Sequence, residues 1–211
     1  ALVYSMWRRV WAQNGSNITK EQNFKPLIEG DNVISLLRSE NFIQIASCII
    51  RKSWLETVGG FNEAHQLIED VDLFLRLAME GACFTRVSTN APQFTYNQRI
   101  GSLSNDGANR KLFIDSCVRN ARMVEDYWKK EKQEINEAMR TVLVNVYSNA
   151  LRYYAGCDVS TFESLCRRLL VLSPKYQPAG GLPKYLTPLI GYPNAELLSA
   201  RLRKIMGRKV V

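Results

Sequence analysis

The hydrophobic pattern of this chain changes near residue 109, and that change limits the folds open to it. Before that point, apolar residues occur in short runs separated by turn residues, which is typical of strands and short helices. After it, residues 111–128 and 135–154 carry apolar residues at the 3.6-residue period of amphipathic helices. The sequence therefore predicts an α/β region at residues 1–108 and a helical C-terminal extension at residues 109–211.

Local patterns predict the individual elements. Strands are expected at residues 2–11, 42–50, 83–87 and 94–96, and helices at residues 53–59, 69–80, 111–128, 135–154, 160–172 and 194–206, with a short helix or turn at 33–38. Ser53 with Glu56, and Ser160 with Glu163, fit the capping box that begins a helix. Residues 12–32 are polar and expected to be irregular. Residues 174–193 hold five prolines and a Gly-Gly pair, which indicates a linker or wrapping loop.

Charge is distributed unevenly along the chain. The 211 residues carry 28 Lys and Arg against 20 Asp and Glu, a formal net charge of +8. Residues 1–109 hold 10 basic and 11 acidic side chains, whereas residues 110–211 hold 18 basic and 9 acidic ones. Such asymmetry suggests two modules, the second of which faces something anionic.

Composition excludes several classes of protein. A hydrophobic content of 46% is normal for a soluble globular domain, so disordered and fibrous classes are excluded. A single histidine excludes a multi-histidine zinc site, and five cysteines without C-x-x-C spacing suggest reduced thiols. With no apolar run long enough to span a bilayer, we expect a cytoplasmic location, with peripheral attachment to the inner face of the membrane as an option.

The stretch from residue 49 to residue 81 carries the chemistry that the sequence offers. A strand leads into a helix that ends at Gly59-Gly60, and a short polar loop then reaches the acidic pair Glu69-Asp70 at the start of the next helix. An ionised carboxylate at a helix N-terminus beside a glycine loop is suited to act as a general base toward a hydroxyl group. The plain alternative is that these acids are ordinary first-turn residues and that Asp72 and Arg76 form an ordinary i, i+4 pair.

This block resembles the acceptor half of family 2 inverting glycosyltransferases of the GT-A fold. That family typically carries Gly-Gly-Phe-Asp/Asn-Glu, a short loop, Glu-Asp-x-Asp-Leu-x-Leu-Arg and then Gly. Residues 59–63 read Gly-Gly-Phe-Asn-Glu, residues 69–76 read Glu-Asp-Val-Asp-Leu-Phe-Leu-Arg, and Gly81 follows, in the same order and spacing. Residues 2–4 also resemble the strand that follows the family's metal-binding motif.

The resemblance implies transfer of a sugar from a nucleotide-sugar to a saccharide or lipid-linked acceptor hydroxyl, with inversion. Asp70 matches the family's catalytic base, and Glu69 beside it would orient the loop or touch the acceptor. Gly59 and Gly60 would let the backbone approach the sugar, because no Cβ stands in the way. Arg76 is expected to tie the helix down through its partner Asp72 rather than to touch substrate.

Two features depart from the family pattern. Residues 96–104 resemble its closing Tyr-Arg-x-His-x-Gly-Ser-x-Ser motif, but Asn97 replaces the Arg and Arg99 replaces the His. Arg99 cannot bind a metal, yet its guanidinium could pair with a diphosphate; an ordinary surface arginine is the alternative. The family's nucleotide-binding half, with an Asp-x-Asp motif that holds Mg²⁺ or Mn²⁺, does not precede the block. We therefore expect a glycosyltransferase fragment that is inactive alone, without metal ligands of its own.

Other features keep alternatives open. His65 lies in the loop where an acceptor would pass, so it is a candidate for acceptor binding as well as an ordinary polar loop residue. The basic C-terminal end carries apolar residues at helical spacing, which fits a helix on an anionic membrane surface, a helix docked on another protein segment, or a solvated face. A rival reading is thus a non-catalytic interaction module whose basic helical tail binds a membrane or a protein partner. No nucleic-acid-binding motif is visible, so no nucleic-acid partner is expected.

Overall fold

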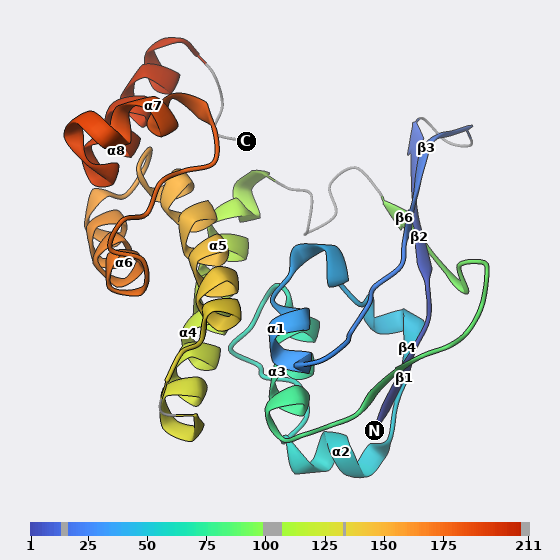
Figure 1. Cartoon of the computed structure of the whole chain (residues 1–211). Coiled ribbons are helices and arrows are strands. Elements are labelled where there is room, and N and C mark those ends of the chain that lie inside the picture. Colours follow the sequence, from blue (N-terminus) through green and yellow to red (C-terminus); the bar gives the residue numbers. More distant parts are fainter. Residues whose placement is uncertain (14–16, 99–106, 133, 208–211) are drawn as a thin grey trace. The chain divides into compact units, whose positions relative to one another are not determined.

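The computed structural model describes residues 1–13, 17–98, 107–132 and 134–207; the side chains of residues 12, 13 and 17–19 are not described. The chain divides into two compact units, Ala1–Gln133 and Glu134–Val211, and each is described here by itself. The first unit is a mixed α/β structure and the second is helical, so the coarse class predicted from the sequence is confirmed (Figure 1). The predicted boundary after residue 108 falls just before the long helix α4, which lies within the first unit.

Two three-stranded sheets of mixed direction form the β part of the first unit. In one, β1 (Leu2–Tyr4) lies between the antiparallel β4 (Cys48–Ile50) and the parallel β5 (Phe84–Arg86). In the other, β2 (Trp7–Gln13) lies between the antiparallel β3 (Asn17–Phe24) and the parallel β6 (Phe94–Gln98). The predicted strand at 2–11 is therefore two consecutive strands, each of which becomes the centre of its own sheet.

Two predictions in this region were wrong. Residues 12–32 were expected to be irregular, but β3 occupies residues 17–24 and pairs with β2 so that Phe24 stacks on Trp7, with ring centroids 4.0 Å apart. The strand was not predicted because residues 20–23 are polar and solvent-exposed, so β3 lacks the apolar pattern of a buried strand. Residues 42–50 were expected to be one strand, but Ile45–Ser47 forms a 3-10 turn (η2), and only the last three residues join the sheet.

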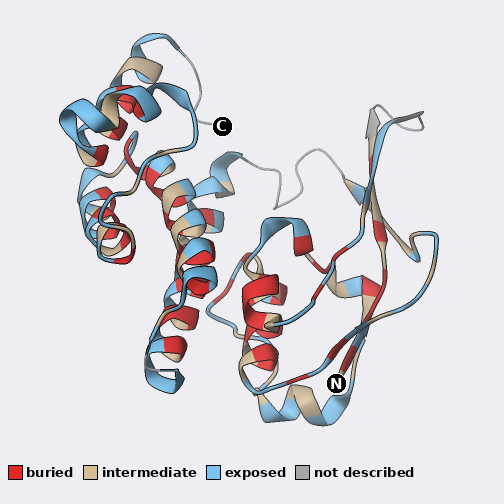
Figure 2. Ribbon diagram, viewed as in Figure 1, coloured by how far each residue is buried: buried red, intermediate tan, exposed pale blue. Residues whose placement is uncertain are grey.

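Helices α1 (Asn32–Leu36), α2 (Lys52–Thr57), α3 (Glu69–Met79) and α4 (Arg110–Glu131) complete the first unit, together with the 3-10 turns η1 (Ser39–Asn41) and η4 (Gly107–Asn109). The predicted capping box at Ser53 was wrong, because Arg51 is the N-cap of α2 and makes no side-chain capping bond. Helix α3 is the centre of the core, because Leu73, Leu75 and Leu77 have no exposed surface. Figure 2 shows buried segments, in red, on α1 and α3. A hydrogen bond from the Tyr127 hydroxyl to the Met79 carbonyl (3.1 Å) ties α4 to the end of α3.

The second unit consists of α5 (Glu137–Tyr154), α6 (Val159–Leu172), α7 (Gly181–Ile190) and α8 (Tyr192–Ile205) in the described residues. Tyr147, Phe162 and Leu169 are fully buried and form part of the core of this unit. The N-cap of α6 is Asp158, whose carboxylate accepts from the Thr161 N–H, so the predicted capping box at Ser160 was wrong.

The segment 174–193 was expected to be a linker or wrapping loop, and this was wrong because it contains α7. Pro183 lies in the first turn of the helix, where its missing N–H has no intrahelical partner to lose. Pro188 lies inside the helix, and Gly191, with φ 77°, ends it before α8 begins. Pro183 and Gly191 thus mark the two ends of a short helix, which also accommodates Pro188.

Candidate active site

The acidic pair lies where the sequence predicts, in the first turn of α3. Glu69 is solvent-exposed, whereas Asp70 retains only 9% of its surface. Ile68, directly before them, has φ 53° and is the non-glycine residue with a positive φ in the described part of the chain. A β-branched residue in this conformation costs on the order of 1–3 kcal/mol, and such strain tends to gather at functional sites. The chain thus enters α3 through a strained turn.

Burial gives Asp70 an unusual proton affinity. Desolvation, and then the nearby charge of Glu69, raises the pKa of Asp70 from the ordinary 3.8 to about 6. The Val71 N–H donates to Asp70 Oδ1 at 2.9 Å and opposes this rise by stabilising the ionised form. Burial, and then the charge of Asp70, raises the pKa of the Cys48 thiol to about 11. Asp70 is therefore a carboxylate that ionises near neutral pH.

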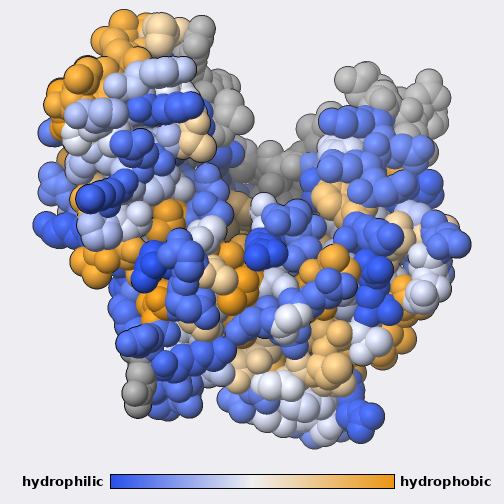
Figure 3. Space-filling model, viewed as in Figure 1, coloured by the Kyte–Doolittle hydropathy of each residue, from blue (hydrophilic) through white to orange (hydrophobic). Residues whose placement is uncertain are grey.

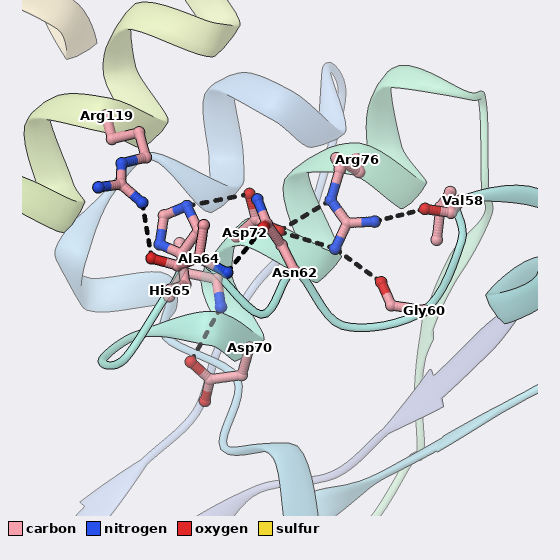
Figure 4. A network of polar contacts seen from close by, with 10 residues as sticks. Val58, Gly60, Asn62, Ala64, His65, Asp70, Asp72, Arg76 and Arg119 are labelled. Carbon is pink, nitrogen blue, oxygen red and sulfur yellow. Dashed lines mark hydrogen bonds and ion pairs between the residues drawn. The ribbon is translucent and has the colours of Figure 1, made fainter.

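Asp72, two residues further along α3, has the opposite surroundings. Its side chain is 1% exposed, and its Oδ2 accepts from Arg76 Nε at 2.8 Å and lies 2.7 Å from Arg76 Nη2. Its Oδ1 lies 3.3 Å from His65 Nε2. Figure 4 shows Asp70 pointing away from this network. The predicted pairing of Asp72 with Arg76 is confirmed.

Arg76 also reaches the glycine loop, a role that the sequence did not reveal. Its Nη1 donates to the Val58 carbonyl at 2.6 Å, and its Nη2 donates to the Gly60 carbonyl at 2.8 Å (Figure 4). One guanidinium therefore holds the last turn of α2, the glycine loop and a buried carboxylate of α3 in a fixed arrangement. A planar fork of five N–H donors is suited to such a junction, whereas lysine is not. We call Asp72, Arg76 and His65 the α3 anchor.

The conformation of the backbone explains both glycines. Gly59 and Gly60 have φ of 74° and 72°, which L side chains adopt only with strain. The Gly60 N–H donates to the Leu55 carbonyl at 2.8 Å, and the Gly59 N–H to the Glu56 carbonyl at 3.2 Å, so the pair ends α2. A Cβ at either position would have no atom within 4 Å. That these glycines let a sugar approach stays a prediction.

His65, a candidate for acceptor binding, lies inside the protein. Its side chain is 1% exposed, its Nε2 faces Asp72, and its buried Nδ1 has no hydrogen-bond partner among the described residues. The loop around it is held by the Asn62 side chain, which accepts from the Ala64 N–H, and by Arg119 of α4, which donates to the Ala64 carbonyl at 2.8 Å. In this arrangement His65 supports the loop. A lone histidine in a polar loop carried no sequence signal of that role.

Arg99 and most of the closing motif lie outside the described residues, so the candidate diphosphate contact has no structural description. A cavity of about 320 Å³ lies beside the α3 anchor, with Val58, Arg76, Glu80 and Tyr127 in its lining. Neither Glu69 nor Asp70 lines this cavity. The sequence did not predict it, because its walls come from α2, α3 and α4.

The described residues do not offer a set of side chains suited to bind a metal ion. No group of three or more His, Cys, Asp or Glu side chains is clustered among them. The Asp-x-Asp letters at residues 70–72 do not form a metal pair, because Asp70 points away and both oxygens of Asp72 face His65 or Arg76. Asp70 and Asp72 therefore do not form a metal-binding pair in this arrangement.

No family model matches this chain, and no curated protein or solved structure was found to be similar to it.

Proposed function

We propose that this chain is the acceptor side of a family 2-like, GT-A-type inverting glycosyltransferase, with Asp70 as its general base. The proposal is supported by the order of the elements: β4, then α2, the double glycine, the polar loop, and α3 with the acidic pair in its first turn. In the reaction, the acceptor oxygen forms a bond to the anomeric carbon while the bond from that carbon to the diphosphate oxygen breaks. The hydroxyl proton passes to the Asp70 carboxylate, and the nucleoside diphosphate leaves.

The observation that carries this proposal is the contrast between Asp70 and Asp72. Asp72 is compensated by Arg76 and His65, which suits a structural anchor. Among the described residues no cation pairs with Asp70, and its pKa is raised to about 6 by burial. A carboxylate with that pKa is mostly ionised at pH 7, yet binds a proton more strongly than an ordinary aspartate does, which is what a general base near neutral pH requires.

The other candidate residues take supporting roles. Glu69 is exposed beside Asp70 and is free to meet an acceptor hydroxyl, while its charge contributes to the raised pKa of Asp70. Gly59 and Gly60 form the loop held by Arg76, and His65 positions the polar loop by its contact with Asp72. Arg99 would pair with the donor diphosphate.

The donor half is a further part of the proposal. Apart from the proposed contact of Arg99 with the diphosphate, the nucleotide-sugar would be bound by residues outside this chain, as would the Mg²⁺ or Mn²⁺ that the family resemblance implies. When bound, the metal would neutralise charge on the departing diphosphate. We assign it no ligand among residues 1–211, and we expect little or no turnover by this chain alone.

Transfer assays with the full-length protein test the proposal. A panel of nucleotide-sugars is offered with saccharide and lipid-linked acceptors, and Asp70→Asn is compared with the wild-type protein. Because a general base contributes about 10²- to 10⁴-fold to a rate, Asp70→Asn should lower kcat by that factor. The matched control is Glu40→Gln, which removes an exposed carboxylate from η1, outside the proposed site, and should leave kcat unchanged. Wild-type transfer by Asp70→Asn at neutral pH would refute the assignment.

A further inference from the structure

Helix α7 exposes a continuous apolar stripe. Leu182, Tyr185 and Leu189 are 42%, 70% and 79% exposed, and their i, i+3, i+7 spacing puts them on one face of the helix. Of the ten residues of α7, only Pro183 is buried. A helix that packs on its own unit through so little of its surface leaves its apolar side chains available to something outside the protein.

Helix α8 carries exposed apolar residues as well. It packs against α7 across Gly191. Its Leu198 and Ile205 are 40% and 80% exposed, and Met206, directly after the helix, is 56% exposed. Figure 3 shows hydrophobic residues gathered at the edge of the second unit that α7 and α8 occupy in Figure 1. We call the two helices, Gly181 to Ile205, the α7–α8 hairpin.

Basic side chains accompany the apolar ones. Lys184, Arg201 and Lys204 are exposed, and Lys184 Nζ lies 5.9 Å from the centre of the Tyr185 ring. Glu196 is the acidic residue between Gly181 and Gly207, and it is buried and paired with Arg203 at 2.9 Å. The exposed charge of the hairpin is therefore positive, and it lies next to exposed apolar side chains.

We propose that the α7–α8 hairpin binds the surface of an anionic lipid bilayer. Apolar side chains flanked by lysine and arginine, with a tyrosine that joins a ring to a hydroxyl, are the chemistry of helices that lie in the plane of the headgroups. No helix in the described residues is long and apolar enough to cross a membrane, which suits attachment at the surface. This inference stands apart from the proposed catalysis, since it uses no residue of the first unit.

The charge of the hairpin favours lipid over a second copy of the chain. Two copies of an exposed surface whose charges are all positive repel each other, whereas phosphatidylglycerol or phosphatidylserine headgroups supply the opposite charge. Each lysine or arginine near such a surface adds about 1 kcal/mol to binding, and exposed apolar side chains add to it. Binding should therefore require both anionic lipid and low or moderate salt.

The experiment is co-sedimentation of the full chain with vesicles of phosphatidylcholine alone or with phosphatidylglycerol added. We expect binding to the anionic vesicles that weakens as salt is raised. Arg201→Gln with Lys204→Gln should weaken it about 30-fold, which corresponds to about 2 kcal/mol at 1.4 kcal/mol per tenfold change. Tyr185→Ser with Leu189→Ser should weaken vesicle binding at least about tenfold, because two exposed apolar side chains of α7 are lost.

Matched controls separate a specific surface from general stickiness. Ile49→Ser removes an apolar side chain as exposed as Leu189 (79%), but from β4 of the first unit. Lys52→Gln with Lys130→Gln removes two exposed charges from the first unit. Both controls should bind vesicles as the wild-type chain does. Binding that ignores lipid charge and salt would overturn the proposal. So would equal loss in the controls, or dimerisation through the hairpin without vesicle binding, measured by sedimentation equilibrium.

Discussion

The glycine loop with α3 and the α7–α8 hairpin are built with opposite placement of charge and apolar surface. In the first region, charged side chains are buried: Asp72 is 1% exposed and is held by Arg76, and Asp70 is 9% exposed. In the second, Tyr185 and Leu189 are 70% and 79% exposed. Buried charge fixes geometry and shifts proton affinity, whereas several exposed apolar side chains on one helix face are typical of a binding surface.

The comparison also separates two kinds of residue within one helix. Asp70 and Asp72 both lie near the N-terminus of α3. The carboxylate of Asp72 is paired with Arg76 and His65, whereas that of Asp70 has no such partner among the described residues. Compensation makes a carboxylate structural. A buried carboxylate without a partner, such as Asp70, lowers the stability of the fold when it is ionised. Proteins typically keep such a carboxylate where a functional site uses it.

The largest expected effect is on the α3 anchor. Arg76→Met leaves the Asp72 carboxylate buried without its cation and frees the Val58 and Gly60 carbonyls, so we expect a loss of about 3–5 kcal/mol in the free energy of unfolding. Urea unfolding followed by circular dichroism measures it. Lys52→Met, which breaks an exposed pair with Glu56, is the control and should change stability by less than about 0.5 kcal/mol. Equal losses in the two variants would contradict the claim that the buried pair stabilises the fold more than the exposed pair.

Substitution of Asp70 should have a smaller effect on the free energy of unfolding, and should raise it. Because its folded pKa of about 6 lies above the ordinary 3.8, the folded state binds the proton more tightly, and stability falls as pH rises from about 4 to about 6. Asp70→Asn removes that cost, so it should raise the free energy of unfolding by on the order of 1–3 kcal/mol above pH 6, and by little below pH 4. Urea titrations at pH 4 and pH 7.5 give the comparison. Destabilisation at pH 7.5 would mean that Asp70 is a compensated structural residue like Asp72.

The glycine loop should respond more weakly. Gly60→Ala places a Cβ at φ 72° with no steric contact around it, so only backbone strain is added. We expect a loss of about 1–2 kcal/mol in the free energy of unfolding. Gly107→Ala is a control, because that glycine has no positive φ and its Cβ would also meet nothing within 4 Å. If both variants were neutral, the loop would not be held in its conformation by Arg76.

The smallest effect on stability is expected in the α7–α8 hairpin. Leu189→Ser removes a side chain that is 79% exposed, so the free energy of unfolding should change by no more than about 0.5 kcal/mol. Thermal unfolding of the full chain measures it, and Leu165→Ala, at a fully buried position of α6, should cost about 2–5 kcal/mol. A large loss in Leu189→Ser would show that this surface packs within the protein.

The sequence predicted the core helices and the first-turn position of the acidic pair because those features depend on local pattern. Leu73, Phe74 and Leu77 follow the 3.6-residue period of a helix, and Glu69-Asp70 lies in the first turn of α3, directly before that pattern. Strand β3 was missed because its residues are polar and exposed, and its pairing partner β2 gives it its structure. Helix α7 was missed because five prolines within residues 174–193 suggested a loop. Proline in the first turn of a helix, where Pro183 lies, is compatible with the helix.

The site was predicted in part. The pairing of Asp72 with Arg76 follows from i, i+4 spacing, but the bonds from Arg76 to the Val58 and Gly60 carbonyls span 18 and 16 residues and depend on the fold. The burial of His65 depends on how the polar loop folds over α3, which no short pattern records. The raised pKa of Asp70 depends on burial, which is a property of the packed structure.

The most direct test of the central claim is the pKa of Asp70 in this chain. Titration of its side-chain carboxyl carbon by ¹³C NMR, assigned with Asp70→Asn, should give a pKa of about 6. Lowering of that pKa by Glu69→Gln would identify the charge of Glu69 as a second cause beside burial. A pKa near the ordinary 3.8 would contradict the account, because Asp70 would then be a common first-turn residue rather than a base prepared by its surroundings.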